Sequence, residues 1–190
     1  MHLKNRPIVV KQDSQPVVLT VGHSTRPLEE FIALLAAHSV SRLIDVRTVP
    51  RSHHNPQFNR DTLPVALEAV GIRHAHVAGL GGFRHTYLGS LNMGWRNVSF
   101  RGFADYMQTP EFAENLAYLI DQATRERIVL MCAEAVPWRC HRSLIADALV
   151  VHGIRAEEVI SKTRLQLHTL TPFARVDGMT ITYPTQIPSP

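Results

Sequence analysis

The sequence predicts an α/β protein with three layers, in which a mostly parallel sheet has helices on both faces. Short apolar runs typical of buried strands alternate along the chain with segments whose apolar residues recur at helical spacing. This alternation is typical of a mostly parallel sheet. The length of 190 residues, of which 45% are hydrophobic and 19% charged, suits one well-buried domain.

The N-terminal half of the chain alternates strands and helices. Residues 17–21 form an apolar run, which predicts the first strand. A helix follows, because Pro27 and two glutamates suit its first turn and its apolar residues fall on one face. Residues 43–46 are the second predicted strand, residues 61–70 the second helix and residues 72–77 a third strand.

The second half begins with an irregular stretch. Residues 83–101 are rich in Gly, Asn, Arg and aromatic residues without a clear period, which indicates a long functional or lid-like loop. Thr109 and the Pro-Glu pair after it predict a helix start. Residues 128–131 are a buried strand, residues 144–149 repeat at one-face helical spacing, and residues 158–160 are a short last strand.

The termini are expected to lie outside this domain. Residues 1–16 are polar and interrupted by prolines, so we expect a flexible leader. Residues 17–176 form the single α/β domain, and residues 177–190 a C-terminal tail with a candidate edge strand at 179–183. We expect a cytoplasmic protein without membrane partners, because no apolar run approaches the roughly 20 residues that span a bilayer and no secretory signal is recognisable.

Both cysteines of the chain flank one polar loop between the fourth strand and the next helix. Cys132 ends the strand, and Cys140 lies at the helix start with Arg139, His141 and Arg142 around it. The helix dipole and the nearby positive charges lower a thiol pKa, which favours a nucleophilic, redox-active or metal-binding cysteine. The alternative is that both thiols are small buried packing groups.

Polar residues also follow the first and second strands. His23 and Ser24 follow the first strand, and Asp45, Arg47, Arg51 and Ser52 follow the second; if these strands are neighbours, all of them meet the cysteine loop at one crevice. An aspartate beside an arginine then gives either an acid/base pair near an anion pocket or a structural ion pair.

Two other chemistries are disfavoured by spacing. Six residues separate Cys132 from Arg139, one more than in the usual phosphatase loop, and Pro137 lacks an N–H donor for a phosphate cradle. No metal site is predicted, because the cysteines are eight positions apart and no CxxC or HxxxH motif supports them. The sequence identifies no cofactor.

The order of the motifs resembles the domain of unknown function 488 family. The motifs GHST, DVRxxPRS, LGG, CAExxxxxCHR and LTPFAR occur in that order between residues 17 and 175. The resemblance implies a compact three-layer α/β fold and a set of marked positions, but no reaction. One departure is His168-Thr169, where the family pattern has a His-Pro-like pair. The marked positions are Gly22, His23, Ser24, Asp45, Arg47, Pro50, Ser52, Phe58, Gly81, Gly82, Cys132, Glu134, Cys140, His141 and Arg142.

Three functions remain open from the sequence. The first is an enzyme or ligand-binding domain for an anionic small molecule. Its catalytic candidates are Cys140, Glu134, His141 and Asp45, and its anion-binding candidates are His23, Ser24, Arg47, Arg51, Ser52 and Arg142. The second is a nucleic-acid-binding or processing module, because the net charge is +4 and residues 83–101 interleave arginines with aromatic residues. The third is a non-catalytic interaction domain; the sequence predicts no oligomeric state.

Overall fold

A mixed sheet forms the centre of the molecule. The computed structural model describes residues 15–185. Within these residues the main sheet has six strands in the order β3-β2-β4-β1-β5-β6, and all neighbours pair in parallel except β6, which runs antiparallel to β5. The strands are β1 (Val17–Gly22), β2 (Arg42–Asp45), β3 (Arg73–His76), β4 (Ile128–Cys132), β5 (Arg155–Ser161) and β6 (Arg164–Leu167).

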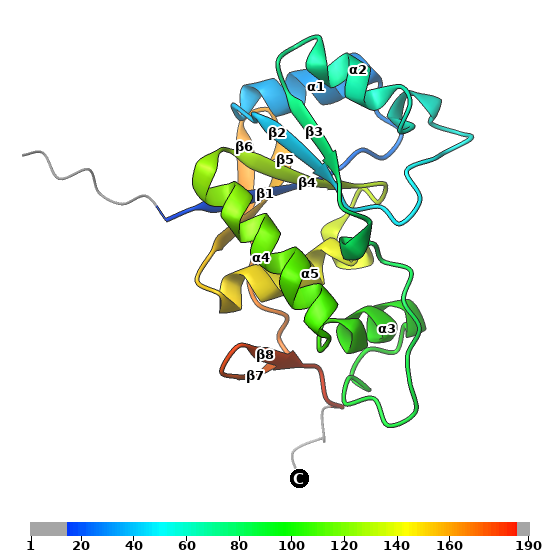
Figure 1. Ribbon diagram of the computed structural model, residues 1–190, viewed down its shortest axis with the longest axis vertical. Helices are drawn as coiled ribbons and strands as arrows, with labels where there is room; N and C mark the ends of the chain where they lie inside the picture. Colours follow the sequence, from blue (N-terminus) through cyan, green and yellow to red (C-terminus); the bar gives the residue numbers. More distant parts are fainter. Residues whose placement is uncertain (1–14, 186–190) are drawn as a thin grey trace, which may run out of the picture.

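Helices cover both faces of the sheet (Figure 1). The helices are α1 (Leu28–Ala37), α2 (Leu63–Glu68), α3 (Val98–Tyr106), α4 (Pro110–Arg125) and α5 (Arg142–Val151), and short 3₁₀ turns lie at Pro56–Phe58, Ala78–Leu80 and Pro137–Arg139. One core cluster joins α1 and α2 to one face, and a larger one joins α3, α4 and α5 to the other. The predicted three-layer α/β architecture is confirmed.

The register of the sheet brings three strand ends together. β4 lies between β1 and β2, so the end of β1 at Gly22 is level with Cys132, and Asp45 is level with Met131. Because these strands are parallel, the loops that follow them leave the sheet at the same edge. The fully buried sequence of β4 explains its central position, since strands covered on both faces read as continuous apolar runs.

Two regular elements differ from the sequence predictions. Helix α3 begins within the stretch expected to be an irregular loop; the Asn97 side chain caps it by accepting the Ser99 N–H at 2.8 Å. Strand β6 was not predicted, because its sequence RLQL is short and mostly exposed.

The C-terminal segment packs against the domain. The candidate edge strand at 179–183 appears as β8 (Thr180–Thr182), which pairs with β7 (Arg175–Asp177) in a separate two-stranded sheet rather than with the main one. Ile181 and Tyr183 are buried, so this hairpin is held by the α5 side of the molecule (Figure 1). The predicted leader at residues 1–16 falls almost entirely outside the described residues. No helix among residues 15–185 has the length and apolarity needed to cross a bilayer.

Candidate functional site

A cavity of about 540 Å³ opens at the carboxyl ends of β1, β2 and β4. Its lining comes from the loops after these strands, from the segment before α3 and from the start of α5. The lining residues are His23, Arg47, Thr48, Val49, Arg51, Ser52, Gly82, Phe83, Asn97, Ser99, Phe100, Cys132, Ala133, Glu134, Arg139, Cys140 and His141.

Most residues expected in the site from the sequence line this cavity, and three do not. Ser24, Asp45 and Arg142 are not among the lining residues; Asp45 and Arg142 are fully buried, and Ser24 is partly exposed. The sequence did not identify the contribution of Phe83, Asn97, Ser99 and Phe100. The Asn-x-Ser-Phe sequence, in which the asparagine caps a helix, is the sequence feature that could have indicated this part of the cavity lining.

The two cysteines meet at the floor of the cavity. Their Sγ atoms are 2.6 Å apart, both thiols are free, and each residue is only 3% exposed. Burial raises the pKa of Cys132 well above its ordinary value, so Cys132 stays protonated and donates its S–H. Burial alone would also raise the pKa of Cys140. The hydrogen bonds from Cys132 and His141 and the charge of Arg142 outweigh burial and hold the Cys140 pKa well below its ordinary value.

The start of α5 supplies further donors to the Cys140 sulfur. The backbone N–H of Arg142 points at Cys140 Sγ over 3.5 Å, and His141 Nδ1 lies 3.6 Å from the same sulfur. His141 Nε2 donates to the Val46 carbonyl at 3.2 Å, because that carbonyl can only accept. His141 Nδ1 therefore accepts a proton when the ring is neutral and donates to the thiolate when the ring is charged.

Asp45 and Arg47 form a buried ion pair. Arg47 Nε donates to Asp45 Oδ1 at 2.9 Å, Arg47 Nη2 donates to Oδ2 at 2.5 Å, and Asp45 also accepts the backbone N–H of Arg47. The Asp45 carboxylate is fully buried and so saturated that it has no free lone pair facing the cavity. Asp45 is therefore engaged by Arg47 and does not face the cavity.

His23 supports the same arginine from the first strand. Its ring stacks on Phe58 with centroids 4.1 Å apart, its Nδ1 donates to the Ser24 carbonyl at 2.7 Å, and its Nε2 lies 3.4 Å from Arg47 Nη1. Burial lowers the pKa of His23 to about 4; the hydrogen bond to Ser24 opposes this shift and the charge of Arg47 adds to it. His23 is therefore neutral at pH 7 and accepts from Arg47.

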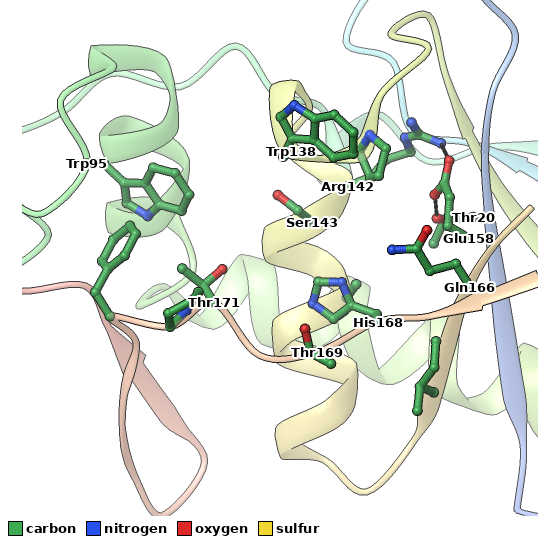
Figure 2. A pocket seen from close by; sticks show the side chains of 15 residues that line it. Thr20, Trp95, Trp138, Arg142, Ser143, Glu158, Gln166, His168, Thr169 and Thr171 are labelled. Atoms are coloured by element: carbon green, nitrogen blue, oxygen red, sulfur yellow. Dashed lines mark hydrogen bonds and ion pairs between the residues drawn. The ribbon is translucent and has the colours of Figure 1, made fainter. Parts of the chain in front are cut away.

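Arg142 reaches from the cysteine floor into a second cavity of about 320 Å³. Figure 2 shows its guanidinium beside Glu158, with Trp138, Ser143 and His168 around the hollow. Arg142 Nη1 pairs with Glu158 Oε1 at 3.4 Å, and Nη2 donates to the Glu134 carbonyl at 2.9 Å. Arg142 thus ties the cysteine loop to β5.

Two structural features limit other readings of the site. Within residues 15–185 no three His, Cys, Asp or Glu side chains are placed together so that they could hold a metal ion.

In the 83–101 stretch, Arg84 stacks over the Tyr106 ring at 3.6 Å and Arg101 donates to the Trp95 carbonyl. These two arginines and the half-buried Trp95 therefore hold the loop onto the domain.

Comparison with protein-family profiles matches residues 27–149 to one family, described as Domain of unknown function DUF488. Searches of curated proteins and of solved structures each gave no significant match. The matched range contains both cysteines and α5 up to Leu149.

Proposed function

We propose that this chain, which belongs to the family described as Domain of unknown function DUF488, is an enzyme whose Cys140 thiolate attacks a small anionic substrate in the cavity at the strand ends. The observation that carries this proposal is the surrounding of Cys140 Sγ. A thiol, an imidazole nitrogen and a helix N-terminal N–H all face this one sulfur on the floor of a cavity. A sulfur surrounded by donors is held as thiolate, the form that reacts.

His141 is the proposed proton carrier. Its Nδ1 is the ring atom nearest Cys140, and the Val46 carbonyl fixes the ring through Nε2. A neutral imidazole in this orientation takes the thiol proton and returns it to a leaving group. Glu134 is the second candidate for proton transfer, since it is the one carboxylate among the described residues lining the cavity.

Two arginines at the rim of the cavity favour an anionic substrate. Arg47 lies in the wall beside His23, while Arg51 and Arg139 are exposed at the rim and make no ion pair with any residue in 15–185. The charge of Arg47 is offset by Asp45, so the attraction of negatively charged molecules comes from Arg51 and Arg139, which outnumber the one lining carboxylate, Glu134. Ser52 supplies a neutral polar group to the lining.

Nucleic-acid binding receives less support from the geometry. Of the aromatic and basic side chains that suggested it, Arg84, Arg101, Trp95 and Phe100 are engaged within the domain. Phe83, Tyr87 and Arg96 remain exposed, and stacking platforms for bases usually need several such groups in a row. The remaining alternative, a non-catalytic interaction domain, predicts an ordinary thiol at Cys140.

Alkylation kinetics test the enzyme proposal. Cys140 should react with iodoacetamide at a rate that levels off well below pH 8.5, the approximate pKa of a free cysteine, whereas the urea-unfolded chain follows the free-cysteine value. Peptide mapping by mass spectrometry assigns the modified thiol. A Cys140 that titrates like the unfolded control would overturn the proposal.

A charged reagent tests the anion preference separately. Iodoacetate should be favoured over iodoacetamide relative to the ratio measured with N-acetylcysteine. The double variant R51A/R139A should lose that preference. R125A, which removes an exposed arginine of α4 paired with Asp121, should keep it. Equal ratios for the protein and the free thiol would contradict an anion-binding cavity.

A further inference from the structure

The second cysteine, Cys132, lies close enough to Cys140 for the two sulfurs to form a disulfide bond. Cys132 ends β4 and Cys140 precedes α5, so a strand and a helix start hold the two sulfurs in place from opposite sides of one loop. Their separation of 2.6 Å needs to shorten by only about 0.5 Å to reach the length of a disulfide bond. Both residues line the same cavity and are reached from it.

We propose that this site carries out thiol–disulfide exchange on small anionic disulfides, with Cys140 as the attacking thiolate and Cys132 as the resolving thiol. This inference rests on the proposed function and names its substrate class. A neighbouring thiol assists turnover when Cys140 carries a sulfur-linked group, because it then attacks Cys140 Sγ and expels that group. A carbon or phosphorus adduct on Cys140 would gain nothing from Cys132 at that position.

The exchange balances in two steps. Cys140–S⁻ attacks a disulfide R–S–S–R, forming Cys140–S–S–R and releasing R–S⁻. The Cys132 sulfur then attacks Cys140 Sγ, its proton passes to the departing sulfur, and R–SH leaves as the Cys132–Cys140 disulfide forms. The protein is oxidised by two electrons and the substrate is reduced by two; a second small thiol or dithiol reverses the protein step.

The different protonation of the two sulfurs fits these roles. The thiolate character of Cys140 makes it the nucleophile of the first step, whereas Cys132 remains a thiol and does not compete. The first step removes the charge of Cys140, so the hydrogen bond that Cys132 donated is lost and its sulfur is released for the second attack.

The cavity selects the substrate by charge and size. Arg51 and Arg139 at the rim face incoming anions, and Phe83 and Phe100 give an apolar wall for the body of the molecule. A volume of about 540 Å³ admits a small-molecule disulfide but not a folded protein domain.

One chromogenic anionic disulfide, 5,5′-dithiobis(2-nitrobenzoate), tests the inference. Given one equivalent of reagent, the native protein should release two equivalents of the coloured thiolate and lose two protons of mass with no retained adduct. Variant C132S should release one equivalent and retain the adduct on Cys140; serine keeps a hydroxyl donor toward Cys140, so the thiolate is preserved. Variant C140S should react at least about tenfold more slowly, because the remaining thiol is protonated.

The outcomes separate this inference from the proposed function. Rapid labelling of Cys140 with an adduct that persists in the native protein would overturn the exchange chemistry and leave the nucleophile proposal intact. A Cys140 that does not react would overturn both. Cystamine, a cationic disulfide, should react more slowly than dithiodiglycolate when each rate is divided by the rate with N-acetylcysteine; the reverse order of these ratios would overturn the anionic substrate class. Circular dichroism of each variant shows that it is folded, and the native-protein mass measurement requires no variant.

Discussion

At the scale of single residues, burial decides the charge of His23. The side chain is 1% exposed and stacked on Phe58, and its Nε2 accepts from the guanidinium of Arg47. A protonated ring would place a second positive charge against that arginine. The histidine of the GHST motif therefore positions an arginine rather than transferring protons.

This protonation state makes stability depend on pH in a defined window. His23 has a pKa of about 4 in the folded chain against 6.5 when unperturbed, so between these values the unfolded chain binds a proton that the folded chain does not. The free energy of unfolding should therefore fall as the pH drops from 6.5 to 4, by up to about 3 kcal/mol from this residue. Denaturant unfolding of the native protein and of H23Q across this range measures the difference.

The matched control for that experiment is H53Q, which replaces an exposed histidine in the loop after β2. It should retain the full pH dependence, whereas H23Q should flatten it. If H23Q and the native protein lose stability in parallel, the neutral His23 is refuted.

At the scale of elements, Asp105 of α3 holds the 83–97 segment against the domain. Its buried carboxylate accepts from Ser90 Oγ at 2.6 Å, Asn92 Nδ2 at 2.7 Å and Thr86 Oγ1 at 2.7 Å. Burial raises the pKa of Asp105, but these hydrogen bonds outweigh it and the net pKa is lowered. One side chain thus replaces the regular hydrogen bonding that this irregular segment lacks.

Replacing Asp105 should loosen that segment specifically. D105N turns one acceptor into a donor that faces other donors, at a cost of about 2 kcal/mol. Hydrogen exchange should accelerate in residues 84–97 and remain unchanged in β4. D121N, on the exposed face of α4, should alter neither region; uniform acceleration across the chain would instead indicate global destabilisation.

Gly22 at the end of β1 packs directly against the backbone of the cysteine loop. A Cβ atom at this position would lie 1.8 Å from the Glu134 carbonyl oxygen, and the loop backbone cannot swing away as a side chain could. The same carbonyl accepts from Arg142 Nη2, so any displacement also moves the start of α5. Close approach between β1 and the cysteine loop therefore requires glycine.

The variant G22A should both destabilise the fold and slow Cys140. We expect a loss of about 1–3 kcal/mol, typical of overpacking, together with slower alkylation of Cys140 as the donors around its sulfur shift. T25A, an exposed change in the same turn, is the control and should leave both unchanged. Unaltered Cys140 reactivity in folded G22A would contradict the coupling.

The missed helix α3 shows where sequence patterns fail at this scale. Phe100, Phe103 and Ala104 have helical spacing, but Gly102 lowers helix propensity in their midst. The structure explains this glycine, because a Cβ there would lie 2.4 Å from the Arg84 carbonyl oxygen. The packing of the loop over the helix therefore requires a glycine, and this glycine weakens the helical pattern in the sequence.

At the scale of the whole molecule, most of the strands and helices were predictable because they bury an apolar run or stripe, whereas α3 and β6 were not. The meeting of the strand-end motifs was also predictable once the strands were taken as parallel neighbours, and His23 and Arg47 do lie together. The pairing of Arg142 with Glu158 was not predictable. Glu158 lies on β5, on the other side of β1 from β4, and no local sequence pattern links the two residues. Ion pairs between distant elements depend on tertiary packing alone.

Tyr183 joins three parts of the molecule at its C-terminal end. Its hydroxyl donates to Asp147 of α5 at 2.9 Å, its N–H donates to Asn92 Oδ1 at 2.9 Å, and its carbonyl accepts from Gly94 at 2.8 Å. Asp147 also accepts from His168 at 2.7 Å. The C-terminal hairpin, the 83–97 segment and α5 therefore share one buried polar network, and we expect them to unfold together.

Removing the Tyr183 hydroxyl tests this shared network. Y183F keeps the ring in its fully buried position but leaves one oxygen of Asp147 without its donor, so stability should fall by about 1–3 kcal/mol. Y118F, a half-exposed tyrosine on α4, should change stability by less than about 0.5 kcal/mol. Hydrogen exchange should quicken together in residues 92–94, α5 and β8, since all three contact the same network. Exchange that quickens in β8 alone would show that the hairpin opens independently and that the network does not couple it to the cysteine-bearing helix.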